Sequence, residues 1–358
     1  MAARGFQRLP VARVDRLTPD AAAITFAVPA ELAAEFAFRP GQSLTVRRPD
    51  GHGDERRSYS ICAPAGAPLR IGVREVAGGA VSGWLVREAA PGDVVEVMPP
   101  SGSFTPDLTA CAGAHVLIAA GSGITPVLSI ASSLLAARAD TTVTLLYGNR
   151  RAGTVMFADE VADLKDAYPA RMQLVHVLSR EPREVELFSG RLDAAKLRAL
   201  VPAVTDPGQV AGWWLCGPLP MTEGAVAVLT ELGVPRARIH RELFYVEDEP
   251  PAVVRHSDAD AGAGVLAGAE VTVILDGRKA TLTAPAGAAI LDAAQRVRPD
   301  LPFACKGGVC GTCRARVLAG ETRMRRNYAL EPEEVDAGYI LTCQARPVSD
   351  AVTVDYDG

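Results

Sequence analysis

Short apolar runs separated by turn residues fill the first hundred residues of the chain. The runs lie at residues 22–28, 43–46 and 69–73. Glycine and proline mark the turns between them, as at 39–41. Frequent short strands with this punctuation are typical of a barrel or sandwich, and we predict an antiparallel β-barrel over residues 1–106.

Longer elements follow from residue 107. A continuous apolar strand at 116–120 leads into a glycine turn and a helix at 125–138. Strands and helical stretches then continue at 142–147, 157–168, 172–178 and 213–216. Strands separated by helices indicate a parallel, doubly wound sheet, so residues 107–245 are predicted to form an α/β domain.

A third pattern begins after residues 246–268. This segment is rich in Glu, Asp, Pro, Ala and Gly, and we predict that it is an exposed linker. Beyond it, two β-prone runs at 270–275 and 279–284 flank Asp276-Gly277, a strong hairpin signal. Residues 269–358 are therefore expected to form a separate C-terminal domain.

Composition narrows the class of protein. The 358 residues favour two or three domains, and 48% hydrophobic content is typical of globular proteins. A formal charge of −5 gives no sign of the basic surface that nucleic acid requires. Residues 1–10 have no apolar core after their arginines, so no secretory signal is predicted.

One apolar stretch resembles a membrane span. Residues 108–137 contain no Asp, Glu, Lys or Arg. Gly121, Gly123 and Pro126 interrupt the middle of the stretch, however, which favours a buried strand, a turn and a helix. We therefore predict no association with a membrane.

Four of the seven cysteines are spaced C-x4-C-x2-C…C, namely Cys305, Cys310, Cys313 and Cys343. This is the spacing of plant-type [2Fe–2S] ferredoxins. Glycines at 307, 308 and 311 suit a loop whose N–H groups turn toward the sulfurs. Zinc with four cysteine ligands is the alternative, but such sites usually use two C-x2-C pairs. An odd number of cysteines at this spacing fits a reducing cytoplasm better than a disulfide framework.

The predicted cluster implies a flavin if nicotinamide is the electron donor. A nicotinamide delivers two electrons as hydride, a [2Fe–2S] centre accepts one, and a flavin can separate the pair. In the motif R-S-Y-S at 57–60, Arg57 suits a pyrophosphate, Tyr59 can stack on a flat ring, and Ser60 can hydrogen-bond a ring nitrogen. The segment G-G-A-V-S at 78–82 either offers N–H groups to phosphate or forms only a hairpin turn.

The motif G-S-G-I-T-P at 121–126 lies between a predicted strand and a predicted helix. A pyrophosphate commonly meets a helix N-terminus at such a position. Pro126 replaces the last glycine of G-x-G-x-x-G, so this is not the standard dinucleotide fingerprint, and a structural turn is the alternative.

The order of these motifs, followed by C-G-P at 216–218, resembles the ferredoxin–NADP reductase superfamily with a ferredoxin domain fused at the C-terminus. Segments at 147–150, 178–181, 327–332 and 338–344 are similar to the reductase subunits of phenylacetyl-CoA epoxidases. The resemblance spans essentially the whole chain. It implies a β-barrel for FAD, a doubly wound domain for NAD(P)H and an α+β ferredoxin of the β-grasp type.

The resemblance also implies roles for individual residues. It assigns FAD contacts to Arg57, Tyr59, Ser60, Val81 and Ser82. It assigns the nicotinamide site to Gly123, Thr125, Cys216 and Gly217. It places Tyr59, Ser60 and Cys216 where hydride passes to the flavin. Cys62 and Cys111 match no role and are expected to be core or surface thiols, and the five histidines are expected to be structural.

The choice of nicotinamide depends on the residues that follow two of the parallel strands, where the superfamily places the adenosine ribose. NADH-selective sites usually have a carboxylate there, whereas a 2′-phosphate needs cations. Arg150, Ser179 and Arg180 are suitable phosphate ligands, although Glu181 could neutralise Arg180. We therefore predict a preference for NADPH over NADH.

The expected electron path runs from NADPH through FAD and the cluster to a diiron oxygenase on other chains. The resemblance implies that the oxygenase epoxidises the ring of phenylacetyl-CoA. The reductase of another oxygenase (a Rieske-type hydroxylase, a steroid hydroxylase or a desaturase) would have the same modules. A plain electron-carrier ferredoxin with a degenerate front half is the non-enzyme alternative, and the intact motifs at 57–60 and 216–218 argue against it.

Overall fold

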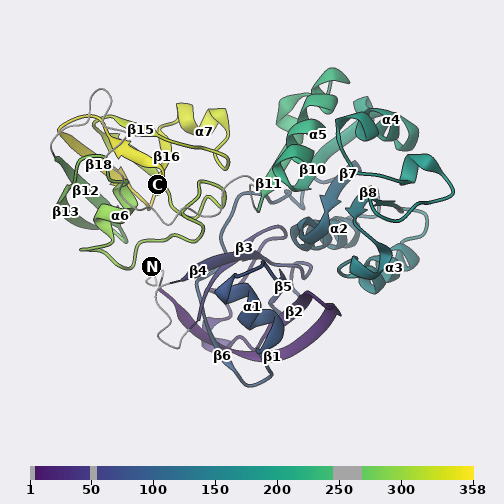
Figure 1. Ribbon diagram of the computed structural model, residues 1–358, viewed down its shortest axis with the longest axis horizontal. Helices are drawn as coiled ribbons and strands as arrows, with labels where there is room; N and C mark the ends of the chain where they lie inside the picture. The colour runs from purple at the N-terminus through teal and green to yellow at the C-terminus, as the bar shows by residue number, and fades with distance from the viewer. Residues whose placement is uncertain (1–4, 49–54, 245–267) are drawn as a thin grey trace. The chain divides into compact units, whose positions relative to one another are not determined.

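The computed structural model describes residues 5–48, 55–244 and 268–358 (Figure 1). All of the predicted linker except Gly268 lies outside the described residues. The chain divides into two compact units. One contains residues 248–358 with the short segments 1–6 and 56–58, and the other contains 7–55 and 59–247. The predicted domain boundaries remain predictions.

An antiparallel barrel forms the first part of the larger unit, except for residues 56–58 at the start of one strand, which belong to the smaller unit. Its strands are β1 (Gln7–Thr18), β2 (Ala21–Phe26), β3 (Ser43–Arg47), β4 (Arg56–Ser60), β5 (Arg70–Arg74) and β6 (Val94–Val97), in the order β4-β3-β6-β1-β2-β5. An antiparallel bridge between Ile61 and Ile71 joins the end of β4 to β5 and closes the sheet. Buried aliphatic side chains such as Leu9, Ile24 and Leu44 fill the interior. The predicted barrel is confirmed.

The barrel also contains a helix that the sequence pattern did not predict. Helix α1 (Ala80–Arg87) begins at the N-cap Gly79, so residues 78–82 start a helix and do not form a hairpin turn. Valine, glycine and tryptophan make this segment a weak helix former. Burial of Val81, Trp84 and Leu85 against the barrel core stabilises the helix instead. The expectation that these hundred residues are purely β was wrong here.

A five-stranded parallel sheet forms the second part of the larger unit. Its strands are β7 (Gly113–Ala120), β8 (Thr141–Asn149), β9 (Met172–Leu178), β10 (Val210–Gly217) and β11 (Ile239–Leu243), in the order β11-β10-β7-β8-β9. The helices are α2 (Ile124–Ala137), α3 (Ala158–Ala167), α4 (Ala194–Val204) and α5 (Leu219–Glu231). Residues of α2 and α3 pack in one buried cluster and those of α4 and α5 in another. The sheet is therefore doubly wound, as predicted.

The strand order creates a switch point between β7 and β10. The chain continues from β7 to β8 and β9 on one side, and returns to β10 and β11 on the other. Ligands of open α/β sheets bind beyond the carboxyl ends of the strands at such a point. The segments that follow β7 and β10 are therefore the expected ligand-binding segments.

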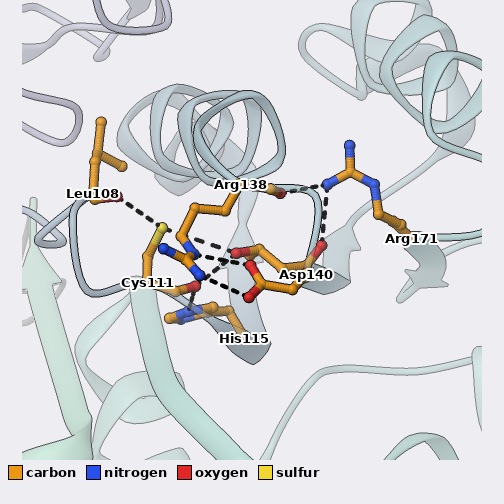
Figure 2. Close-up of polar contacts among 7 residues, drawn as sticks. Leu108, Cys111, His115, Arg138, Asp140 and Arg171 are labelled. Atoms are coloured by element: carbon orange, nitrogen blue, oxygen red, sulfur yellow. Dashed lines mark hydrogen bonds and ion pairs between the residues drawn. The ribbon is translucent and has the colours of Figure 1, made fainter.

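The opposite, amino ends of these strands are held by a polar network without features of a ligand site (Figure 2). The Cys111 carbonyl accepts hydrogen bonds from Thr141 Oγ1 at 2.7 Å and from His115 Nε2 at 3.0 Å. Arg138 pairs with Asp140 at 2.7 Å, and Arg171 donates to the Arg138 carbonyl. His115 thus has the structural role expected of it.

The smaller unit is built on a five-stranded mixed sheet. Its strands are β12 (Ala269–Leu275), β13 (Arg278–Ala284), β14 (Arg314–Ala319), β16 (Tyr339–Leu341) and β18 (Ala351–Asp355), in the order β13-β12-β18-β14-β16. Strands β15 (Thr322–Met324) and β17 (Ala345–Pro347) form a separate ribbon, and the helices are α6 (Ile290–Ala294) and α7 (Pro332–Asp336). Asp276 and Gly277 have φ values of 52° and 68°, as the predicted hairpin turn requires.

The apolar stretch at 108–137 contributes β7 and α2, with the short 3-10 helix η2 (Gly121–Gly123) between them. Within the described ranges, none of the helices has the length and apolar character needed to cross a membrane.

Candidate nicotinamide, flavin and iron–sulfur sites

A cavity of about 670 Å³ opens at the carboxyl ends of the parallel strands. The segments that follow four of the strands supply its wall: Gly121 and Ser122 after β7, Arg150 after β8, Ser179 and Arg180 after β9, and Gly217 and Pro218 after β10. Arg74 and Glu75 at the end of barrel strand β5 complete it. The structure therefore brings four sequence-predicted residues together here, Arg150, Ser179, Arg180 and Gly217.

Gly123 and Cys216 do not line the cavity but are the chain neighbours of its lining residues Ser122 and Gly217, and they are called its floor. A Cβ atom on Gly123 would lie 2.1 Å from the Cys216 carbonyl oxygen, so only glycine permits this contact between η2 and β10. Cys216 is fully buried, and Thr125 is 1% exposed with its hydroxyl bonded to the Ser122 carbonyl at 3.0 Å. The predicted residues Gly123, Thr125 and Cys216 thus shape the site from below and do not line its wall.

A glutamate that the sequence did not reveal lies beside two of the predicted catalytic residues. The Ser60 hydroxyl, at the end of β4, donates a hydrogen bond to Glu242 Oε2 at 3.2 Å. Glu242 on β11 is also the register partner of Cys216 on β10. Desolvation raises the pKa of Glu242 to about 8, and the hydrogen bond from Ser60 lowers it in part. Burial, with a smaller contribution from Glu242, raises the pKa of the Cys216 thiol.

These pKa shifts determine which side chains of the site are protonated at neutral pH. The Cys216 thiol stays protonated at neutral pH, so it acts as a small neutral group and not as a thiolate. Glu242 is mostly protonated at neutral pH, and its proton lies within one hydrogen bond of Ser60. Ser60, Cys216 and Glu242 therefore form a neutral, proton-carrying cluster.

The barrel residues predicted for FAD fit a flavin nucleotide. Tyr59 is half-buried and packs against the barrel core, so its ring is held in place. Helix α1 begins at Gly79 without a side-chain cap, which leaves its first N–H groups for an anion. Val81 and Ser82 occupy this first turn, and the Ser82 hydroxyl fixes the preceding loop by accepting from the Val76 N–H at 3.1 Å. Arg57 lies three positions before Ser60 in the same strand.

Positive charge collects at the β8 and β9 end of the cavity. Arg150, Arg180 and Arg191 are all exposed and line the wall there with Ser179. Asp193 lines the same cavity, and its Oδ1 accepts a hydrogen bond from the Lys196 N–H at 2.9 Å. Glu181 is occupied elsewhere, since its Oε2 accepts a hydrogen bond from the Ala152 N–H at 2.8 Å. Arg191 was not predicted from the sequence, because it lies in a loop eleven positions after Arg180 and follows no strand.

An unsatisfied amide lies in the same wall. Asn149 is buried at the end of β8, and neither its Oδ1 nor its Nδ2 makes a hydrogen bond of ordinary geometry. Buried amides are normally hydrogen-bonded. The residues at this end of the cavity therefore fit a nucleotide that carries polar groups and negative charge.

The four predicted cluster cysteines lie close together in two pairs. The Cys305 and Cys310 thiols are within hydrogen-bonding reach of each other, and so are the Cys313 and Cys343 thiols. The neighbouring thiol lowers the pKa of Cys305 and of Cys343. Two thiolates per iron is the arrangement that a [2Fe–2S] cluster requires. Among the described residues, no three metal-binding side chains surround one point as a single zinc ion would need.

The loop around these sulfurs has left-handed backbone at two of the three predicted glycines, Gly308 and Gly311, and at Lys306 in place of Gly307. Lys306, Gly308 and Gly311 have φ values of 52°, 79° and 69°. The Gly307 N–H donates to Cys305 Sγ at 3.3 Å, and the buried Gln344 amide donates to the Lys306 carbonyl at 2.8 Å. The loop thus presents N–H groups to the sulfur side, as a bound cluster needs.

The remaining thiols are structural. Cys62 and Cys111 are each 2% exposed. Burial raises the pKa of Cys62 to about 12, so its thiol is unreactive at neutral pH.

Comparison with known proteins identifies the modules. Residues 273–348 match the model of the 2Fe-2S iron-sulfur cluster binding domain, and residues 117–227 match that of the oxidoreductase NAD-binding domain. A subunit of the 1,2-phenylacetyl-CoA epoxidase from Escherichia coli K12 is 41% identical, over 98% of this chain and 98% of its own. The ferredoxin reductase component of 3-ketosteroid-9-alpha-monooxygenase from Rhodococcus rhodochrous is 38% identical, over 97% and 96%.

Solved structures have the same architecture. Phthalate dioxygenase reductase superposes over 98% of both chains with a TM-score of 0.61 at 24% identity, which shows the shared fold. The cytochrome P450 reductase GcoB of Amycolatopsis is 31% identical and covers 67% of this chain and 70% of its own, with a TM-score of 0.57.

The chain therefore belongs to the ferredoxin–NADP reductase superfamily, in the group with a C-terminal [2Fe–2S] ferredoxin domain. It is an NAD(P)H-dependent oxidoreductase that carries a flavin-reductase module and a [2Fe–2S] module.

Proposed function

We propose that this protein is the reductase component of an oxygenase, and that it passes electrons from NADPH through FAD and the [2Fe–2S] cluster to the diiron oxygenase of a phenylacetyl-CoA 1,2-epoxidase. One observation carries the proposal: the 41% identity to the 1,2-phenylacetyl-CoA epoxidase subunit of Escherichia coli extends over essentially the whole of both chains. The cysteine pattern supports a reducing cytoplasm as its compartment.

The described side chains have two roles, the binding of cofactors and the holding of a proton. When bound, a flavin accepts hydride and releases single electrons, and a [2Fe–2S] cluster accepts one electron at a time. Tyr59 supplies a flat surface for the flavin ring, and the first turn of α1 supplies N–H groups for its pyrophosphate. Cys216 closes the floor with a neutral thiol. Glu242 holds a proton at its carboxyl beside the Ser60 hydroxyl.

The cationic end of the cavity supports NADPH as the donor. Arg150, Arg180 and Arg191 line the same cavity as Ser179, and Glu181 is engaged by the Ala152 N–H rather than by Arg180. A 2′-phosphate would be matched by guanidinium groups and a hydroxyl, whereas a free ribose would leave the arginines uncompensated.

A second acceptor is favoured nearly as strongly by similarity. The 3-ketosteroid-9-alpha-monooxygenase reductase component of Rhodococcus rhodochrous is 38% identical over almost the same length. The difference of three percentage points, 41% against 38%, does not by itself separate the two oxygenases, so the acceptor must be identified by reaction.

Reconstitution with each purified oxygenase component tests the proposal. With the phenylacetyl-CoA oxygenase, NADPH and phenylacetyl-CoA, we expect epoxide formation coupled to NADPH oxidation. With the 3-ketosteroid oxygenase and its steroid we expect only slow, uncoupled NADPH consumption. Coupled steroid hydroxylation with no epoxide formation would assign this reductase to the other oxygenase.

A further inference from the structure

Arginines gather on the two-stranded ribbon of the ferredoxin unit. Arg323 on β15 and Arg346 on β17 are register partners, so their side chains lie on the same face. Arg325 follows two positions after Arg323 and Arg326 comes next. Arg323, Arg325 and Arg326 are exposed, and Arg346 is half-buried. Arg323, Arg325 and Arg346 are called the arginine face.

The two opposed arginines have no compensating carboxylate within the part of the unit that the structure describes. Three other cations of the same unit are paired: Lys306 with Asp292 at 2.9 Å, Arg314 with Glu334 at 3.1 Å and Arg298 with Asp300 at 2.8 Å. Like charges directly opposite each other destabilise a strand pair. The ribbon therefore keeps an unfavourable pair that an anionic partner surface would relieve.

The arginine face is connected directly to the cluster loop. The Arg325 N–H donates to the Gln344 carbonyl at 3.0 Å, and Gln344 follows the ligand Cys343 in sequence. The Gln344 amide donates to Cys343 Sγ at 3.5 Å. On the other side, the Tyr328 N–H donates to the Gly308 carbonyl at 3.0 Å. The backbone from 325 to 328 thus lies against the sulfur-binding loop.

One acidic residue, Glu321, lies at the far end of the ribbon from the cluster. The register runs from Thr322 and Pro347 through the arginine pair to Met324 and Ala345, and then to the contact of Arg325 with Gln344. Glu321 precedes β15 and is therefore at the end remote from Gln344. The positive charge is concentrated toward the cluster.

We propose that the arginine face is the surface through which the cluster passes electrons to the oxygenase component, and that the oxygenase presents an acidic patch around its electron-accepting group. The proposal rests on the proposed function in that the acceptor is an oxygenase. Guanidinium groups around the electron exit steer an acidic protein to the cluster and set its orientation, which raises the rate of productive encounter.

Two double variants of the full-length protein, loaded with flavin and cluster, test this inference. Arg323→Gln with Arg346→Gln removes two charges beside the cluster. Arg278→Gln with Lys279→Gln is the matched control, because it removes two exposed charges from β13, at the opposite edge of the sheet from β16. Thermal unfolding and the visible cluster spectrum establish that both variants are folded and loaded.

The first measurement is the KM for the phenylacetyl-CoA oxygenase component as a function of salt. At low ionic strength we expect the arginine variant to raise this KM about tenfold, and the control to leave it within about twofold. The difference should vanish at roughly 1 M salt, where the Debye length falls to about 3 Å. Equal effects of the two double variants, or a parent KM that is independent of salt, would overturn the proposal.

The second measurement uses small acceptors and needs no oxygenase. Reoxidation of the chemically reduced cluster by ferricyanide, an anion, should be several-fold slower in the arginine variant, and reoxidation by hexaamminecobalt(III), a cation, several-fold faster. If the parent reduces no phenylacetyl-CoA oxygenase at any salt concentration, the proposed function fails. The reoxidation rates with the anionic and the cationic acceptor then decide by themselves whether electrons leave through the arginine face. Unchanged rates with both ions would then reject it.

Discussion

The Ser60 hydroxyl donates a hydrogen bond to Glu242 Oε2 at 3.2 Å, although the two residues are 182 positions apart in the chain. Ser60 ends a barrel strand and Glu242 belongs to an outer strand of the parallel sheet. The contact therefore couples the flavin part of the larger unit to its nicotinamide part.

Glu242 should make both the stability of the protein and the rate of hydride transfer depend on pH. Its pKa is raised in the folded protein, to about 8 from an ordinary value of 4.5, so folding favours the protonated form. The stability that this carboxyl contributes is complete below about pH 4.5 and is lost as pH rises from there to about 8. Glu242→Gln should therefore lose less thermal stability than the parent between about pH 5 and 8. Its rate of flavin reduction by NADPH should also lose the inflection near pH 8, and an inflection that persists would assign it to another group.

Gly123 should not tolerate a side chain. Its Cβ would lie 2.1 Å from the Cys216 carbonyl oxygen, which is backbone and cannot move aside cheaply. Gly123→Ala should cost about 1–3 kcal/mol of stability by overpacking and raise the KM for NADPH. Gly153→Ala is the control, because nothing lies within 4 Å of its Cβ position. Equal unfolding temperatures for the two variants would contradict the close contact.

If electrons pass from the flavin to the cluster, loss of the cluster should leave dye reduction intact and stop reduction of a protein acceptor. Cys343→Ser should abolish the cluster and leave the flavin module intact, because the ferredoxin unit has a hydrophobic core of its own. NADPH oxidation with a two-electron dye should continue, while reduction of a one-electron protein acceptor should stop. Cys310→Ser, in the other thiol pair, should behave alike. Loss of dye reduction in a folded, flavin-loaded variant would overturn the proposed order.

Arg180 should discriminate between the two nicotinamides. Arg180→Ala would remove a charged hydrogen bond worth roughly 1.5–3 kcal/mol, which raises the KM for NADPH by about one to two decades with little effect on NADH. Arg198→Ala, an exposed arginine paired with Glu231, is the control. Steady-state kinetics with both donors decide the matter. A parent that prefers NADH, or a variant that loses both donors equally, would refute the NADPH assignment.

His115 should contribute to acid sensitivity. Burial lowers the pKa of His115, so its stabilising contribution is present above the ordinary value of 6.5 and is lost as pH falls. Its Nδ1 accepts from Trp214 Nε1 at 3.4 Å, and protonation of Nδ1 would remove this bond. His115→Gln should be less stable than the parent at about pH 7.5, with a smaller further loss on acidification to about pH 5. Parallel stability curves for parent and variant would exclude this role.

Features formed by residues that are close together in the sequence could be predicted from the sequence alone. The cysteine spacing and glycines of 305–313 predicted the loop, and the loop has the expected left-handed backbone at Gly308 and Gly311, although Lys306 adopts it in place of Gly307. The Asp276-Gly277 turn was predicted for the same reason, because few residues tolerate positive φ at both positions. The alternation of strands and helices was equally sufficient for the doubly wound sheet.

Features that depend on residues far apart in the chain emerged only with the fold. Glu242 acquires its raised pKa because parallel pairing places it opposite Cys216 and a barrel strand brings Ser60 to it. Helix α1 exists because packing against the barrel core outweighs the weak helix propensity of its residues. Arg191 joins the cavity through the path of a loop, and the arginine face forms through the register of β15 with β17. Desolvation, the pairing of distant strands and the course of a loop depend on residues far apart in the sequence, so no local sequence pattern reveals them. The modules and their cofactor motifs could therefore be predicted from the chain alone, whereas the proton and charge environment around them could not.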